Sequence, residues 1–282
     1  MSFGSSAALT DGGPALLGIF AASFIVLAIL EVLAARSLEP QQRRRRWRTN
    51  GALTLLFILV NGLMPVTLVA AAGLASQRDF GVLNLLGLAP AAAFVLTILA
   101  RSLIAYATHR TMHIAPWLWR IHRVHHLDPR LDVSTAARFH PVEPAIVNGI
   151  ALVFVLLLGL DPLAVLSYEL AEAAMAVFSH ANVRLPPWLD RGLGWLLVTP
   201  DLHRVHHSPL QSETDSNFGS TLSIWDRLFG TWRRKPADAL AAQRVGLDEC
   251  ADERAASLLW LLASPVMGTG WRRRDSAARE AE

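Results

Sequence analysis

The residues best suited to chemistry are ten histidines, all of which lie between positions 109 and 207. The segment His109–His126 reads HRTMHIAPWLWRIHRVHH, and its ending, HRVHH, returns at His203–His207. His140 and His180 lie between the two copies. Neutral imidazole is the commonest metal ligand among side chains, and a metal site needs several such ligands in one small volume. The clustering therefore indicates a metal site.

The spacing of these histidines fits helices. His109 and His113 are four residues apart, so on a helix they share one face. The three histidines of each HRVHH are spaced i, i+3, i+4, which also places them on one helical face. A single metal centre takes about four to six ligands, and eight or nine imidazoles exceed that number. We therefore predict a dinuclear site.

The composition indicates a membrane protein. Of the 282 residues, 52% are hydrophobic and only 17% are charged. The net charge of +3 comes from an arginine-rich chain with a single lysine, which in a soluble protein would suggest nucleic acid. Here the arginines flank apolar segments, so we expect no nucleic acid partner and assign the charge to topology and lipid head groups. The single cysteine, Cys250, excludes an internal disulfide and matches no cysteine-based metal motif.

The apolar segments predict an all-α, polytopic membrane fold with four to five transmembrane helices and a histidine-rich cytoplasmic helical cap. Glu169 and Glu172 lie within the last segment, so a buried or re-entrant hairpin is the alternative there. We expect these carboxylates to face protein, either as partners of the metal ligands or paired with Arg101. The link 75–90 is interfacial or re-entrant. The predicted spans are Pro14–Leu33, Asn50–Leu74, Ala91–Tyr106, Pro144–Leu160 and Leu163–Phe178.

The charges of the connecting segments predict the orientation. Residues 35–49 contain six arginines, whereas the charges in 75–90 cancel. By the positive-inside rule the arginine-rich segment is cytoplasmic and anchors the chain at the membrane surface. Alternation of the spans then places every histidine on that face. We expect a multi-pass protein of the cell inner membrane with its active site on the cytoplasmic side.

We divide the chain into 1–92, a transmembrane hairpin and link, 93–240, a catalytic domain, and 241–282, an interfacial helix and tail. Within the last part, 255–266 is apolar but too short to span, and we expect it to lie at the interface or dock. Residues 1–13 lack the basic start of a signal peptide. The final RRRDSAAREAE is expected to be a disordered tail.

Several motifs together resemble a known family. HRTMH, HRVHH, RFHP, FSHAN, TPDLHRVHH, NFG and WDRLFGTW follow one another in this order. They are similar to the fatty acid hydroxylase/sterol desaturase superfamily of integral-membrane di-iron oxygenases, over roughly residues 95–235. A lone HxxHH would be weak, but two of them with an upstream HxxxH make the resemblance specific.

The resemblance implies a non-haem centre of two Fe ions that uses O2 to hydroxylate or desaturate a C–H bond of a lipid. His140 is placed beside the ligands or as a tenth ligand. Asn217 could act through a water, or it is a turn residue before Gly219. The implied metal ligands are His109, His113, His122, His125, His126, His180, His203, His206 and His207.

Ligating histidines need partners for their second ring nitrogen. The acidic candidates are Asp128, Asp132, Glu143, Glu172, Asp201 and Asp226. Four further side chains could line a lipid entrance: Trp117, Leu118, Trp119 and Phe139. For the two tryptophans, anchoring at the membrane interface is the simpler interpretation.

The chain contains no GxGxxG segment and no cytochrome-like haem motif. A separate electron donor, ferredoxin or cytochrome b5-like, with its reductase is therefore expected as a partner. Two alternatives from other classes stay open, a bis-histidine haem membrane protein and a non-catalytic zinc-binding membrane protein. The lipid class is also open among sterols, fatty acyl chains, alkylglycerols and carotenoids, because neither composition nor spacing encodes pocket shape.

Overall fold

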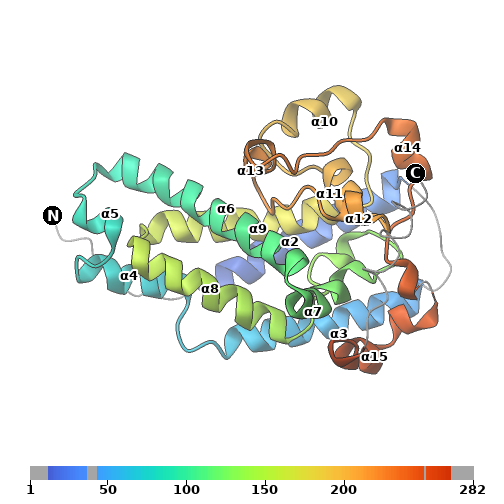
Figure 1. The fold of residues 1–282 in the computed structure, drawn as a ribbon, viewed down its shortest axis with the longest axis horizontal. Helices are drawn as coiled ribbons and strands as arrows, with labels where there is room; N and C mark the ends of the chain where they lie inside the picture. The colour runs from blue at the N-terminus through green and yellow to red at the C-terminus, as the bar shows by residue number, and fades with distance from the viewer. Residues whose placement is uncertain (1–11, 37–42, 251, 268–282) are drawn as a thin grey trace.

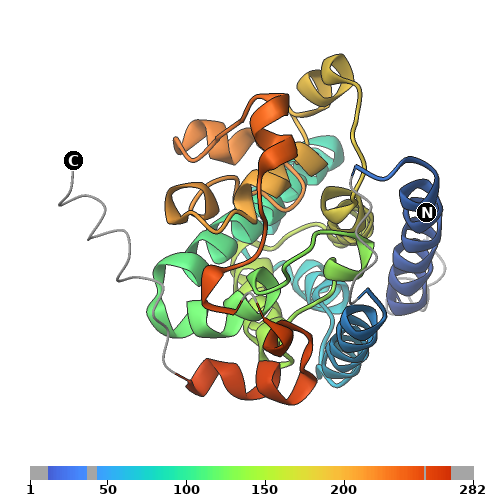
Figure 2. The same ribbon diagram turned by 90° about the vertical axis from the view of Figure 1, so that its right-hand side faces the viewer.

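The computed structural model describes residues 12–36, 43–250 and 252–267 of the chain (Figure 1). Within these ranges the regular structure is helical, apart from two isolated β-bridges, Ala35–Val183 and Leu197–Leu222. The prediction of an all-α fold is confirmed. Long helices run along one axis of the molecule, and most of the short helices gather at one end of it, with α4 (Leu68–Gln77) and α5 (Val82–Leu85) at the other (Figures 1 and 2).

Three helices are long and apolar enough to cross a bilayer: α2 (Gly12–Ala34), α6 (Pro90–Ile114) and α9 (Pro162–His180). A fourth apolar helix, α8 (Val142–Leu158), is shorter. Helices α6 and α9 both have proline at the start, where its missing N–H breaks no helical hydrogen bond. The chain is an integral membrane protein with several membrane-embedded helices.

The predicted single span over Asn50–Leu74 is wrong. The structure has two helices there, α3 (Arg43–Gly62) and α4 (Leu68–Gln77), followed by the short α5 (Val82–Leu85). Pro65 lies in the break, and a proline within a helix removes a hydrogen bond and clashes with the preceding turn. The new helix α4 is then capped by Thr67, whose hydroxyl accepts a hydrogen bond from the N–H of Ala70.

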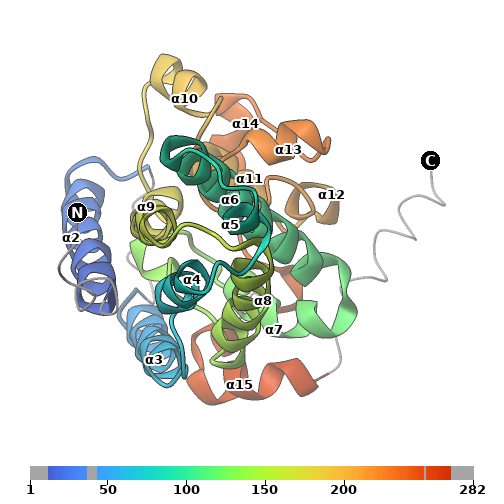
Figure 3. The same ribbon diagram turned by 90° about the vertical axis from the view of Figure 1, so that its left-hand side faces the viewer.

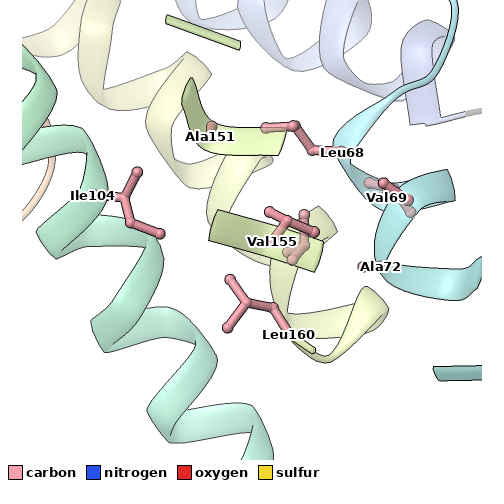
Figure 4. Close-up of a cluster of buried hydrophobic side chains, with 9 residues drawn as sticks. Leu68, Val69, Ala72, Ile104, Ala151, Val155 and Leu160 are labelled. Atoms are coloured by element: carbon pink, nitrogen blue, oxygen red, sulfur yellow. The ribbon is translucent and has the colours of Figure 1, made fainter. Parts of the chain in front are cut away.

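Helix α9 packs against α2, α4 and α6 within the bundle (Figure 3). Figure 4 shows the apolar side chains that α4, α6 and α8 contribute beside it, including Leu68, Ile104 and Val155. In lipid, burial from water no longer drives association, so helices associate through close packing of their side chains. Ala72 and Ala151 in this cluster are small enough to allow that close approach.

The short helices form a cap at the end of the bundle where the histidines lie (Figure 2). It is built from α7 (Pro116–His126), η1 (Val133–Thr135), α10 (Pro187–Leu193), α11 (Pro200–His206), α12 (Gln211–Thr214), α13 (Ile224–Leu228), α14 (Ala237–Ala242), η2 (Asp248–Cys250), η3 (Glu253–Ala256), α15 (Leu258–Ala263) and η4 (Ser264–Val266).

Part of the arginine run has an internal role that its sequence pattern does not indicate. Arg46 is only 5% exposed and forms ion pairs with Asp128, at 2.9 Å, and with Asp132. Asn50 on the same helix also donates to the Asp128 carboxylate, at 2.9 Å. Burial alone would raise the pKa of Asp128, but Arg46 and then Arg138 hold it below its ordinary value. This network ties α3 to the segment that follows the first HRVHH.

The apolar segment 255–266 docks onto the bundle. A single buried cluster contains Leu53 from α3, Trp119 from α7, and Leu247, Cys250 and Leu261 from the C-terminal part. This cluster joins residues from all three proposed domains, and the division itself stays a prediction. Two further predictions, on the signal-peptide start and on the C-terminal tail, fall on 1–11 and 268–282, outside the described residues.

Candidate metal centre

Four helices end at histidines that lie together inside the cap. His113 is in the last turn of α6, and His126, His180 and His206 are the last residues of α7, α9 and α11. The C-terminus of a helix carries partial negative charge from its unpaired carbonyl groups, which favours a cation nearby. The fold therefore brings four such ends to one place, with an imidazole on each.

Nine histidines form two groups in which one ring nitrogen per residue lies within 4.8 Å of the others. We call them the first and second clusters. The first cluster consists of His109, His113, His122, His126 and His206. The second cluster consists of His125, His180, His203 and His207. These are the nine residues that the sequence analysis proposed as ligands, and either group could hold a metal ion.

Each HRVHH motif contributes to both clusters. His122 and His126, four residues apart, point to the first cluster, while His125 joins the second. The second copy does the reverse, because His203 and His207 belong to the second cluster and His206 to the first. The clusters adjoin, with the rings of His126 and His207 stacked at 4.5 Å between centroids. Two helices thus build two neighbouring sites by exchanging one histidine each.

The Nε2 atoms within each cluster converge. In the first cluster the Nε2 of His109 lies 3.1 Å from that of His122 and 3.1 Å from that of His206. In the second, the Nε2 of His180 lies 2.9 Å from that of His203 and 3.0 Å from that of His125. Two nitrogens bound at right angles to one ion with bonds of about 2.1 Å are about 3.0 Å apart. The spacing fits coordination.

In the first cluster, the opposite ring nitrogens show that no proton lies between the Nε2 atoms of His109 and His206. The Nδ1 of His109 donates to the carbonyl of Phe218 at 2.8 Å, and that of His206 to the carbonyl of Ser216 at 2.7 Å. A carbonyl oxygen only accepts, so Nδ1 carries the hydrogen and Nε2 of the neutral ring has a lone pair. Two lone pairs facing each other at 3.1 Å form no hydrogen bond. A cation between them would satisfy both, so the donor set fits a metal ion.

The rings in the cap are held neutral, the form that binds metal. Burial lowers the pKa of His206 to about 3. Burial likewise places the pKa values of the cap histidines well below their ordinary range, namely those of His125, His126, His203 and His207. Burial and mutual repulsion among the rings both disfavour the imidazolium form. Unlike protonated rings, these side chains keep a lone pair available at neutral pH.

Among the acidic candidates, only Glu143 contacts a cluster histidine in the hydrogen bonds resolved within the described part of the chain. Its carboxylate accepts from the Nδ1 of His122 at 2.6 Å. Asp215, which the sequence analysis missed, lies 3.3 Å from the Nδ1 of His113. The other candidates have different partners: Asp128 and Asp132 bind Arg46, Glu172 lies near Arg101, Asp201 binds Arg36, and Asp226 binds backbone N–H groups.

His140 and Asn217 lie outside both clusters. The Nε2 of His140 contacts the carbonyl of Leu262 at 3.2 Å, toward the C-terminal segment. Asn217 is 2% exposed, has a positive φ of 51°, and uses its amide on backbone groups. The geometry of Asn217 thus favours a turn residue, one of the two roles considered above.

The two tryptophans beside the motif differ. Trp117 is 62% exposed, as an interfacial anchor would be, but Trp119 is 2% exposed. The Trp119 ring lies 4.9 Å from that of His113 and 5.4 Å from that of His126, so anchoring at the interface is wrong for this residue. Phe139 stacks on His125 at 4.6 Å. These aromatic side chains help to separate the clusters from water.

The part of the chain that matches known proteins contains both clusters. Residues 94–231 match the fatty acid hydroxylase family. The ornithine lipid hydroxylase of Rhizobium tropici is 35% identical over 133 residues, 46% of this chain and 39% of that protein. Alkylglycerol monooxygenase of Xenopus tropicalis is 31% identical over 144 residues, 49% and 30% of the two chains. The human alkylglycerol monooxygenase is 29% identical over 134 residues, 45% and 27% of the two chains.

The matched part therefore covers less than half the length of each of these curated relatives. No solved structure matches the chain. The helical membrane fold and the two buried histidine clusters define a membrane protein with a candidate metal centre at one end of its bundle. The region that matches the fatty acid hydroxylase family, residues 94–231, contains all nine cluster histidines.

Proposed function

We propose that this protein is an O2-dependent, non-haem di-iron monooxygenase that hydroxylates a C–H bond of a membrane lipid. The observation that carries the proposal is the pair of adjoining clusters, whose buried imidazole lone pairs converge on two points. Nitrogen ligands alone suit Fe, Cu, Ni or Zn, and an oxygenase family favours iron among these. The first cluster would hold one ion and the second cluster the other.

When bound, the two iron ions would supply the electrons and open coordination positions that O2 activation requires. The balanced reaction converts R–H, O2, two electrons and two protons into R–OH and water. The chain's own residues hold the ligands in place. Carbonyl groups of Phe218 and Ser216 fix the rings of His109 and His206 so that Nε2 faces inward. The buried Trp119 and the half-buried Phe139 limit the access of water to the site.

Two observations support a lipid substrate. The clusters lie at the ends of α6 and α9, which are apolar enough to lie in a bilayer, so a lipid could reach them laterally. The relatives named above are a lipid hydroxylase and alkylglycerol monooxygenases. Their names favour hydroxylation over desaturation, with the substrate drawn from the polar lipids.

The electrons come from a separate donor, which we propose is a ferredoxin or a cytochrome b5-like protein with its reductase. We also propose that the centre faces the cytoplasm and that the membrane is the cell inner membrane, because the arginine run 43–48 begins α3 at the cap end. Such donors are cytoplasmic, so the proposed orientation places the centre within their reach.

The two alternatives predict other geometries or other metals. A bis-histidine haem needs a porphyrin plane between two axial nitrogens, whereas here four or five imidazole nitrogens lie within 4.8 Å of one another. A zinc protein could use the same ligands. A visible spectrum of the purified protein without a Soret band would exclude haem, and metal analysis would separate iron from zinc.

The activity is tested by mass spectrometry of total lipid extracts from aerated cells that express the wild type, His125→Ala or His140→Ala. His125 belongs to the second cluster, and His140, outside both clusters, is the matched control. We expect a lipid that gains one oxygen with the wild type and His140→Ala, and loss of that product with His125→Ala. Formation of the product by His125→Ala at the wild-type level would contradict the proposal.

A further inference from the structure

One short loop serves two histidines of the first cluster. The carbonyl of Ser216 accepts from the Nδ1 of His206 at 2.7 Å, and the carbonyl of Phe218 accepts from the Nδ1 of His109 at 2.8 Å. His109 is on α6 and His206 is on α11, so residues two apart in the loop orient ligands from two helices. The residue between them is Asn217.

Asn217 has an unusual backbone conformation. Its φ is 51°, in the left-handed region, which among residues with a side chain asparagine tolerates better than most. Apart from glycines, the described residues contain only one other positive φ, at Asp79. A left-handed residue reverses the local direction of the chain, and here it separates the two accepting carbonyl groups.

The Asn217 side chain fixes that conformation. Its Nδ2 donates to the carbonyl of Leu202 at 2.9 Å and to the carbonyl of Arg233 at 2.7 Å, while its Oδ1 accepts from the N–H of Arg233 at 2.8 Å. Leu202 precedes His203 on α11, so the same amide also ties the loop to the second HRVHH helix. Both amide hydrogens are used, which leaves the side chain engaged with backbone and not directed at a metal.

Asp226 also holds the loop, through the two residues that follow Asn217. The Asp226 carboxylate accepts from the N–H of Phe218 at 2.7 Å and from the N–H of Gly219 at 2.9 Å. Asp226 is 1% exposed, so these bonds are shielded from water. A Cβ at Gly219 would lie 2.4 Å from the Leu222 carbonyl oxygen, so the loop is too closely packed for a larger residue there. These contacts hold the loop, and with it the carbonyl groups of Ser216 and Phe218, in one conformation.

We propose that Asn217 is a positioning residue for the first cluster: it holds the loop so that the Ser216 and Phe218 carbonyls fix the tautomer and direction of His206 and His109. This inference rests on the proposed function, because it assigns Asn217 to one of the two proposed ions. The second cluster does not use this loop. Its His180 contacts the carbonyl of Ala176 in its own helix, at 2.6 Å, so loss of Asn217 affects the two ions unequally.

The test measures iron per purified chain and its rate of release to a chelator. Asn217→Ala removes the three side-chain hydrogen bonds and the preference for positive φ, and Asn217→Gly removes the bonds but permits the φ. We expect the first-cluster ion to be released about 10- to 100-fold faster in Asn217→Ala, the loss typical of removing a ligand's supporting partner. Asn217→Gly should fall between this variant and the wild type, and it carries the test if the alanine variant does not fold.

Two backgrounds identify which ion is lost. With His207→Ala, which disables the second cluster, adding Asn217→Ala should remove most of the remaining iron. With His206→Ala, which disables the first, adding Asn217→Ala should leave the remaining iron unchanged. Asn84→Ala is the matched control, because that side chain also donates to a backbone carbonyl, of Phe80, but on α5 at the other end of the bundle.

The outcomes separate the two claims. Equal release of both ions from Asn217→Ala, or release at the wild-type rate, would overturn the positioning role while leaving a two-iron protein. A wild-type protein that binds no iron overturns the proposed function, and the positioning role with it.

Discussion

The Nδ1 of His122 lies 2.6 Å from a carboxylate oxygen of Glu143, and both side chains are buried. The two residues come from α7 and from the first turn of α8. An anionic partner on one ring nitrogen raises the basicity of the other and fixes its direction. Among the first-cluster histidines, His122 is thus oriented by a charge, whereas His109 and His206 are oriented by carbonyl groups.

Replacing Glu143 should weaken metal binding in the first cluster. For Glu143→Ala we expect an affinity loss of about 10- to 100-fold, and for Glu143→Gln a smaller loss because the amide oxygen still accepts. Iron retained after dialysis against a chelator measures this effect. Glu213→Gln is the control, since Glu213 is a cap carboxylate that pairs with Lys235. Full iron retention by Glu143→Ala would remove the assigned role.

The guanidinium group of Arg101, inside the bundle, should be needed for folding. Arg101 on α6 lies 3.7 Å from Glu169 and 3.8 Å from Glu172 on α9, the pairing considered from sequence. Removing one partner of a buried ion pair typically costs about 3–5 kcal/mol. Arg101→Leu should therefore lower the yield of folded protein in membranes, measured by detergent size-exclusion chromatography.

The rescue of that variant is the sharper test. Adding Glu169→Gln and Glu172→Gln to Arg101→Leu removes the unpaired charges and should restore much of the yield. Arg78→Leu, at an exposed position, is the matched control and should behave as the wild type. If Arg101→Leu itself folds with wild-type yield, the ion pairs do not stabilise the bundle.

The single cysteine should report on the integrity of the cap. Cys250 is 1% exposed, and burial raises the pKa of its thiol from 9.0 to about 11. The reactive form is the thiolate, and at pH 8 a thiol with this pKa is about 0.1% thiolate. Alkylation of the native protein at pH 8 should be very slow, and its rate should rise until about pH 11 rather than 9. Rapid labelling of native protein at pH 8 would contradict this packing.

Reporter fusions test the orientation of the bundle. Gln77 ends α4, which lies at the opposite end of the bundle from the cap (Figure 1). The arginines of 43–48 form the start of α3, at the cap end, so the positive-inside rule places the cap in the cytoplasm. Fusions at Gln77 and at the C-terminus should report opposite sides. The same side for both would require a different path for α8 and α9.

The nine histidines that were predicted as ligands lie together in the structure, because their spacing of three and four residues is a property of one helix. The sequence pattern did not assign them to clusters. Whether His125 or His126 faces a given cluster depends on how α7 packs against α11, and no local pattern encodes that packing. The carbonyl partners at Ser216 and Phe218 were missed for a related reason, because every residue has a carbonyl group and its type gives no signal.

The errors in the predicted fold also have physical causes. Pro65 lies within the predicted span Asn50–Leu74, but in the structure it separates two helices. The apolar residues on either side satisfy a hydropathy window but not a continuous hydrogen-bond ladder. Arg46 was assigned to the membrane surface with its neighbours. Its burial depends on Asp128 and Asp132, which are more than 80 residues later in the chain.

The measurement that tests the central claim most directly is the iron content of the wild type beside His125→Ala and His126→Ala. These neighbouring residues belong to different clusters. We expect about two ions per chain in the wild type, about one in each single variant, and almost none in the double variant, because each ion needs several imidazoles at once. Iron content unchanged by both substitutions would contradict the assignment of the two clusters as a di-iron centre.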